Sequence, residues 1–178
     1  NNQQLQQHDI QEAYRIIFDI LERALEGTPH LQSITNNFRG VQVNHIECLN
    51  CHNIKQRESD FYDLIIPVKG INSLEDSLLS MLTMEKLEAP NQYECDSCNQ
   101  KADALKGIMI RKYPPVLTFS LSRFDFDLEK LQRVKIDSKF TFGVEFDVSM
   151  FAEKPELYSD DEKIYELCAV IIHRGDAF

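Results

Sequence analysis

The spacing of apolar residues changes several times along the chain, and each change marks an expected element. Between Asp9 and Leu25 apolar residues recur every three or four positions, which predicts an amphipathic helix. Gly27 and Pro29 follow this segment and are typical of a helix end. Asp9 occupies the expected N-cap position and Glu12 lies three residues later, as in a capping box. We therefore predict an N-terminal helix with carboxylates in its first turn.

The following pattern is mainly extended. Val41 and Val43 alternate with polar residues, which predicts a strand between residues 38 and 48. Ser73 is expected to cap a short helix that carries Leu74 and Leu78. Further strands are predicted at residues 61–68, 104–110, 116–122 and 164–172, short extended pieces at 134–136 and 140–142, and loops or polar connections at 85–92, 125–133 and 154–163. The fold class is therefore α+β and mostly antiparallel.

The last of these segments, residues 164–172, is apolar on both faces. This pattern predicts a central strand that is covered on both sides. Cys168 lies inside it and is expected to be a buried small hydrophobic residue.

The chain is acidic, with 19 Lys and Arg against 29 Asp and Glu and a formal net charge of −10. This charge disfavours general nucleic-acid binding and suits a basic partner, or serves solubility alone. Since no apolar run approaches the roughly 20 residues of a transmembrane helix, no membrane span is expected. The polar start, residues 1–7, gives no sign of a signal peptide. We therefore expect an intracellular protein, in the cytoplasm, the nucleus or both.

Four of the five cysteines form two pairs with two residues between them, Cys48 with Cys51 and Cys95 with Cys98. One tight turn can present both thiolates of such a pair to one ion, so two pairs complete a tetrahedral zinc site. Four cysteine ligands leave no position for water, which predicts a structural zinc. Four unligated thiols or two disulfides are the alternatives, and His52 is a weak alternative ligand.

Several motifs share their order and spacing with one enzyme family. They begin with Gln7-His8-Asp9-Ile10-Gln11-Glu12, continue through Tyr93 and the second cysteine pair, and end with Leu121, Arg123 and Phe124. In these positions the chain resembles the ubiquitin-specific protease (USP) family of cysteine deubiquitinases. The resemblance covers nearly the whole chain. Further matching positions are Phe38, Gly40, Phe61, Leu64, Ile66, Ala104, Lys106, Ile110, Pro114, Pro115 and Leu117.

The resemblance implies a partial papain-like right-hand fold of thumb, fingers and palm, with a zinc-ribbon-like tip on an antiparallel fingers sheet. Residues 1–37 would belong to the thumb, 38–110 to the zinc-binding fingers, and 111–178 to the palm and blocking-loop region. The implied activity is hydrolysis of the (iso)peptide bond at the C-terminal glycine of ubiquitin. Asp9, Glu12 and Phe124 would bind ubiquitin.

By the same resemblance, the nucleophilic cysteine lies upstream of Gln7 and the catalytic histidine follows the segment 164–172. His173 matches the family's non-catalytic histidine, so no catalytic residue is expected in this chain. We expect the chain to supply contacts that hold ubiquitin, together with zinc-stabilised fingers. The chain alone is expected to be inactive. A catalytically inactive, USP-like ubiquitin-binding or scaffold module stays open as the alternative. The charge disfavours a zinc-ribbon nucleic-acid binder.

Overall fold

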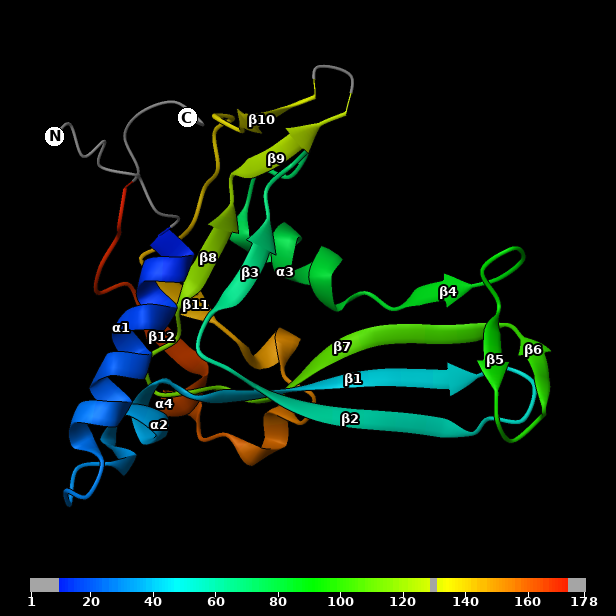
Figure 1. Ribbon diagram of the computed structural model, residues 1–178, viewed down its shortest axis with the longest axis horizontal. Coiled ribbons are helices and arrows are strands. Elements are labelled where there is room, and N and C mark those ends of the chain that lie inside the picture. Colours follow the sequence, from blue (N-terminus) through cyan, green and yellow to red (C-terminus); the bar gives the residue numbers. More distant parts are fainter. Residues whose placement is uncertain (1–9, 129–130, 173–178) are drawn as a thin grey trace, which may run out of the picture.

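The computed structural model describes residues 10–128 and 131–172. Its longest feature is an antiparallel sheet with the strand order β2-β1-β7-β4, which projects to one side of the molecule (Figure 1). In the middle of this sheet Val43 of β1 lies between Glu58 and Met109 of its neighbours. The four strands are β1 (Gly40–Cys48), β2 (Ile54–Phe61), β7 (Ala104–Lys112) and β4 (Glu85–Leu87).

A small hairpin of β5 (Tyr93–Cys95) and β6 (Gln100–Ala102) sits at the outer end of this sheet (Figure 1). It packs on a separate small core made of Cys48, Cys95 and Ala102. We call the four-stranded sheet with this hairpin the fingers, and the hairpin end the fingertip. The main hydrophobic core lies at the other end of the sheet.

That main core belongs to a region that we call the palm. β3 (Leu64–Pro67) pairs in parallel with β8 (Phe119–Ser122), and α3 (Leu74–Leu82) packs on the same core. Ser73 caps α3, since its Oγ accepts from the backbone N–H of Asp76 at 3.1 Å. The buried core comprises Phe61, Leu64, Ile66, Val68, Leu74, Leu78, Ile110, Tyr113, Phe140, Phe146 and Val148.

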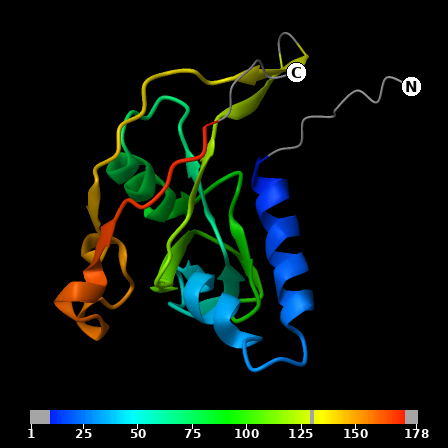
Figure 2. The same ribbon diagram turned by 90° about the vertical axis from the view of Figure 1, so that its left-hand side faces the viewer.

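Two helices, α1 (Ile10–Leu25) and α2 (Gln32–Phe38), form the side of the molecule that we call the thumb (Figures 1 and 2). Phe18 of α1 is buried, and its ring contacts those of Phe38 and Tyr62 at centroid distances of 5.0 and 5.3 Å. Phe38 precedes β1 and Tyr62 follows β2, so this aromatic cluster packs α1 against the palm ends of both strands. No described helix is long and apolar enough to cross a membrane.

The rest of the chain consists of short elements around the palm. β9 (Phe124–Asp127) and β10 (Gln132–Lys135) form a hairpin, and β11 (Glu145–Asp147) pairs with β12 (Ile164–Glu166). Between β11 and β12 lie η1 (Ser149–Phe151), η2 (Pro155–Leu157) and α4 (Asp160–Lys163). The predicted α+β class is confirmed, as are the N-terminal helix, the helix after Ser73 and the strands at 38–48 and 104–110.

The continuous strand predicted at 61–68 is wrong. β2 ends at Phe61 and β3 starts at Leu64, because the chain turns at Tyr62 and Asp63. β2 instead extends back to Ile54, and most of its side chains are exposed. An edge strand of charged residues has no apolar alternation, so its sequence gives no strand signal.

Three expected loops or connections contain structure. Residues 125–133 lie largely in the β9–β10 hairpin, where Phe126 pairs with Arg133. Residues 85–92 include β4, and residues 154–163 include η2 and α4. Conversely, β8 is shorter than the predicted strand at 116–122. The N–H of Val116 donates to Asn37 O at 2.8 Å, which draws the chain toward α2 before β8 begins.

The prediction for residues 164–172 is also wrong. β12 is three residues long, and the run from Leu167 to Ile172 is exposed and has no regular structure. Ile172 is 72% exposed, and Cys168 is exposed rather than buried. β12 pairs with β11 on one side, and no other described strand lies beside it. An apolar pattern buries a segment only where other elements cover it.

Candidate functional site

Four cysteine side chains meet at the fingertip. The Sγ atoms of Cys48, Cys51, Cys95 and Cys98 all lie within 4.8 Å of one another. The Cys48–Cys98 and Cys51–Cys95 Sγ distances are 3.8 and 3.7 Å, so these pairs are not disulfides. The structure thus brings together all four predicted ligands from two segments of the chain.

Tight turns at the strand ends aim these sulfurs inward. After β1 the N–H of His52 donates to Cys48 O at 2.9 Å, and the N–H of Cys48 donates to Asn53 O at 3.0 Å. His52 has a positive φ of 55°, which closes the first turn. Asn99, at φ 49°, does the same after the second pair. Each two-residue spacing therefore places two thiols on the inside of one turn.

The electrostatics of the first turn favour a thiolate at Cys48. The backbone N–H groups of Cys51 and Asn50 donate to its sulfur and lower the pKa of Cys48 to about 7. The N–H of Asn53 favours a thiolate at Cys51 too, but hydrogen bonds with the thiol of Cys98 and burial outweigh it and raise that pKa to about 12. A bound cation would favour the thiolate form of these cysteines, because metal ligation requires deprotonated sulfur.

Zinc fits this donor set. A tetrahedral ion with Zn–S bonds of about 2.3 Å needs sulfurs about 3.8 Å apart, which matches the two Sγ pairs at 3.8 and 3.7 Å. Four thiolates would close the coordination sphere, so the ion would stabilise the fold. His52 is not needed as a ligand, and its Nδ1 lies 3.2 Å from Glu47 Oε1 instead.

Polar contacts surround the cluster, and no pattern in the sequence predicts them. Asn50, inside the first turn, donates to Cys98 Sγ in the second at 3.3 Å. Lys55 of β2 forms an ion pair with Asp96 between the second pair of cysteines. The first contact joins the two cysteine turns and the second joins the second turn to β2, and these residues give no signal in the sequence beyond their nearness to cysteine.

A second candidate site lies at the opposite end of the molecule, where the start of α1 and the junction of β8 and β9 are on the same side (Figures 1 and 2). Tyr14 holds α1 beside the start of β8, since its hydroxyl lies 2.9 Å from Thr118 Oγ1 and donates to Tyr62 O at 3.3 Å. Arg15 lies 3.8 Å from the buried Asp63. These contacts fix the first turns of α1 against the strand that leads to Phe124.

Two of the residues predicted to bind ubiquitin, Glu12 and Phe124, belong to this end. Glu12 is exposed in the first turn of α1, and Phe124 is half-buried at the start of β9. Asp9 lies outside the described residues, as does His173. The ubiquitin-binding roles of Asp9, Glu12 and Phe124 stay predictions.

The hairpin that begins at Phe124 is anchored at its base. Arg123 Nη1 donates to the carbonyls of Ile136 and Ser138 at 2.8 and 3.1 Å. Lys69 pairs with Asp125 at 2.7 Å, and this contact lowers the pKa of the Asp125 carboxyl. The hairpin carries exposed apolar side chains, Phe126, Leu128 and Leu131. It therefore presents an apolar surface from a polar, hydrogen-bonded base.

No described cysteine and histidine form a hydrogen-bonded pair of the kind that activates a thiol protease. Cys168 is exposed and follows a short strand rather than opening a helix. His45 is buried against Gln56, with its Nδ1 3.2 Å from the amide nitrogen of that residue.

Comparisons with known proteins agree with this architecture. The family model "Ubiquitin carboxyl-terminal hydrolase" matches residues 1–178. Human ubiquitin carboxyl-terminal hydrolase 40 is 41% identical over 179 residues, covering 100% of this chain and 14% of that protein. Ubiquitin carboxyl-terminal hydrolase 5 of Schizosaccharomyces pombe is 36% identical over 170 residues, covering 96% of this chain and 15% of that protein. The chain therefore spans a small part of the length of these relatives.

A solved structure is similar as well. One chain of the SAGA Ubp8/Sgf11/Sus1/Sgf73 DUB module superimposes with a TM-score of 0.77 and 26% identity. The match covers 97% of this chain and 41% of that chain. The similarity extends over the fingers, the palm and the thumb together.

Proposed function

The chain belongs to the ubiquitin carboxyl-terminal hydrolase family, in its ubiquitin-specific protease group, and on this premise we propose that it is part of a deubiquitinating cysteine protease. The enzyme would hydrolyse the (iso)peptide bond at the C-terminal glycine of ubiquitin. The family match over all of residues 1–178 carries this proposal, because it includes both ends of the molecule described above.

In this proposal the thumb and the hairpin after Phe124 engage the tail of ubiquitin. Glu12, together with Asp9, would pair with basic side chains of that tail. Carboxylate–arginine pairs are strong and directional, which suits a flexible tail that must be held in one register. Tyr14 supports this role, because its bond to Thr118 keeps the first turns of α1 beside the start of β8.

The fingers would hold the body of ubiquitin. Their stiffness depends on the fingertip, where the two cysteine turns have no large apolar core and bury only Cys48, Cys95 and Ala102. A zinc ion on the four cysteines would join the turns and replace the missing core. Zinc would have no part in the hydrolysis.

The catalytic thiolate and imidazole would come from parts of the protein outside this chain. A thiolate attacks the carbonyl carbon of the scissile bond, and a histidine protonates the departing amine. Four of the five cysteines converge at the fingertip, and Cys168 has no described histidine beside it. We therefore infer that the 178-residue segment alone has no hydrolytic activity.

A fluorogenic ubiquitin C-terminal amide tests both statements. The full-length protein that carries this chain is expected to release the fluorophore, and the isolated segment is expected to release none. Turnover by the segment that is lost in Cys168→Ser would overturn the division of roles. Binding of ubiquitin by the full-length protein without turnover would support the alternative, an inactive ubiquitin-binding module.

A further inference from the structure

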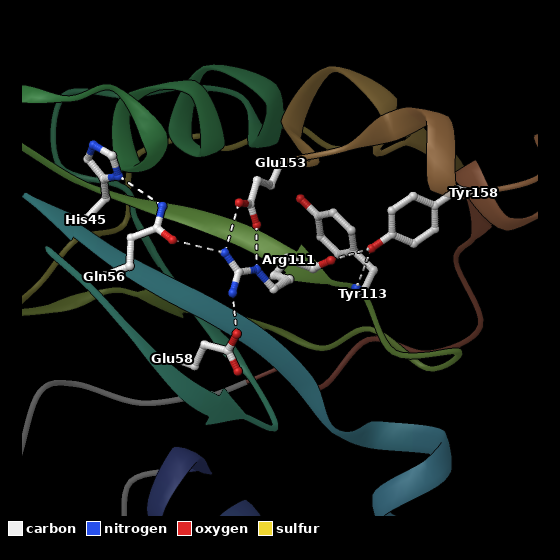
Figure 3. Close-up of polar contacts among 7 residues, drawn as sticks. All are labelled: His45, Gln56, Glu58, Arg111, Tyr113, Glu153 and Tyr158. Carbon is white, nitrogen blue, oxygen red and sulfur yellow. Dashed lines mark hydrogen bonds and ion pairs between the residues drawn. The ribbon is translucent and has the colours of Figure 1, made fainter. Parts of the chain in front are cut away.

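Arg111 joins the fingers to the palm. It lies near the palm end of β7, far from the cysteines, and its guanidinium reaches three other side chains (Figure 3). Nε and Nη2 donate to the two carboxylate oxygens of Glu153 at 2.8 and 3.0 Å, which is a bidentate pair. Nη1 donates to Glu58 of β2, and Nη2 also reaches Gln56 Oε1 at 3.3 Å.

These contacts span three of the four strands of the fingers sheet. Gln56 lies 3.2 Å from Nδ1 of the buried His45 in β1, so the network connects β1, β2 and β7 (Figure 3). Glu153 comes from the segment after η1, which belongs to the palm. The Glu153 side chain is 13% exposed and that of Arg111 is 34% exposed. The Glu153 carboxylate is therefore largely shielded from water, while the Arg111 guanidinium is partly exposed.

Hydrogen bonds of the main chain also join the end of β7 to the palm. The N–H of Glu153 donates to Ile110 O at 2.9 Å, and the Tyr158 hydroxyl donates to Arg111 O at 3.1 Å. That hydroxyl accepts from the N–H of Tyr113 at 3.1 Å (Figure 3). The end of β7 is thus fastened to the palm by its side chain and its main chain together.

Because Arg111 lies near the palm end of β7, a small change of angle there becomes a large displacement of the fingertip. β7 has nine residues, so it is about 30 Å long, and a tilt of about 10° at its base would move the fingertip by about 5 Å. Such a tilt would weaken the binding of a partner that contacts both the fingertip and the palm. A ligand that contacts the palm end alone would be unaffected.

We propose that Arg111 is a positioning residue that, through Glu153 and Glu58, fixes the angle of the fingers against the palm and so sets the register in which ubiquitin's body is held. The ubiquitin part of this proposal rests on the proposed function, while the angle itself does not. Arg111 forms side-chain hydrogen bonds with Glu153, Glu58 and Gln56, and none of these is a predicted metal ligand or a predicted ubiquitin-binding residue.

The angle is measured first, in the full-length protein. Nitroxide-bearing unnatural amino acids at Ser80 of α3 and Lys101 of β6, both exposed, report the palm-to-fingertip distance by double electron–electron resonance. Arg111→Gln is expected to widen this distance distribution, and Arg111→Lys, which keeps the charge without the bidentate fork, should widen it less. Arg23→Gln is the matched control, because Arg23 forms an exposed ion pair with Asp19 on α1. An unchanged distribution in Arg111→Gln overturns the proposal.

Kinetics then separate positioning from general damage. Arg111→Gln should raise KM for a fluorogenic ubiquitin substrate by about tenfold and leave kcat near the wild-type value. Cleavage of a short peptide that carries only the tail of ubiquitin should be unchanged. Equal losses on both substrates would show a structural defect and overturn the positioning role, as would a wider distribution with an unchanged KM. If the wild type cleaves neither substrate while the distribution still widens, the proposed function fails and the angle-fixing role stands.

Discussion

The ring of Phe61 lies directly over the Cα of Gly40, so that a β-carbon on Gly40 would come within 2.1 Å of Phe61 Cζ. The two residues are opposite each other where β1 and β2 reach the palm. Phe61 is buried in the main core, so its ring has no free space into which it can move. The absent side chain of Gly40 is therefore what allows the fingers to meet the palm core this closely.

Gly40→Ala should accordingly destabilise the protein by about 1–3 kcal/mol, which is the usual cost of overpacking a core. Chemical denaturation of the full-length protein measures it. Phe61→Leu in the same background removes the ring edge and should recover part of the loss. A double variant less stable than the sum of the single variants would contradict the steric explanation.

Removal of one fingertip sulfur should release the metal. We expect about one zinc per chain by elemental analysis, and Cys95→Ser should lower both the zinc content and the melting temperature. Cys168→Ser is the matched control, because Cys168 is exposed and is not among the four clustered cysteines. Equal zinc content in the wild type and Cys95→Ser would rule out the site.

The predicted ubiquitin-binding role of Asp9 and Glu12 can be tested with substitutions that remove the charge and keep the size of the side chain. Replacing Asp9 and Glu12 by Asn and Gln keeps the capping ability of the first position, so stability should stay nearly constant. If they grip basic groups, each lost charge-assisted bond costs about 1.5–3 kcal/mol, and KM for ubiquitin should rise by about 10-fold to 100-fold or more.

Salt dependence identifies the cause of that rise. The difference between wild type and the double variant should shrink as salt increases, because screening weakens the wild-type ion pairs most. Glu26→Gln, an exposed charge just beyond the other end of α1, should leave KM unchanged. If the double variant had the same kinetics as the wild type, Asp9 and Glu12 would have no role in ubiquitin binding and would act only as helix caps.

The ion pair of Arg111 with Glu153 predicts that the stability of the protein depends on pH. The hydrogen bonds from Arg111 hold the pKa of Glu153 below its ordinary value of 4.5. Glu153 therefore contributes its full stabilisation above about pH 4.5, where the carboxyl is ionised in both the folded and the unfolded chain. The contribution is lost as the pH falls through the lower, folded-state pKa.

Melting temperatures of wild type and Glu153→Gln, taken between about pH 3 and pH 7, measure this effect. The gap between them should be widest near neutral pH and should close in acid. The comparison cancels the loss of zinc in acid, which both proteins share. Glu156→Gln, an exposed nearby control, should run parallel to the wild type, and a gap for Glu153→Gln that is constant with pH would contradict the ion-pair explanation.

Local signals in the sequence were enough for several parts of this protein. The apolar spacing between Asp9 and Leu25 predicted α1, and Ser73 predicted the start of α3, because helix periodicity and capping depend on neighbours within a few residues. The two cysteine pairs predicted the fingertip cluster for a similar reason. A two-residue spacing defines one turn, and tetrahedral zinc chemistry requires two such turns to meet.

Other features depend on contacts between distant segments. Residues 164–172 have the pattern of a covered strand, yet β12 ends at Glu166 and Ile172 is exposed, because burial requires other elements to pack against the pattern. The sequence did not predict the β9–β10 hairpin, because β9 is only four residues long and charged residues surround Phe126, while its pairing is decided across the turn.

The junction of fingers and palm belongs wholly to the tertiary structure. Arg111 and Glu153 are 42 residues apart, and no periodicity or motif connects them. The sequence by itself determined α1, α3, the four clustered cysteines and the class of the fold, since these follow from short-range spacing. The tertiary structure decided the meeting of Arg111 with Glu153, because the energy of an ion pair depends on distance and burial in space.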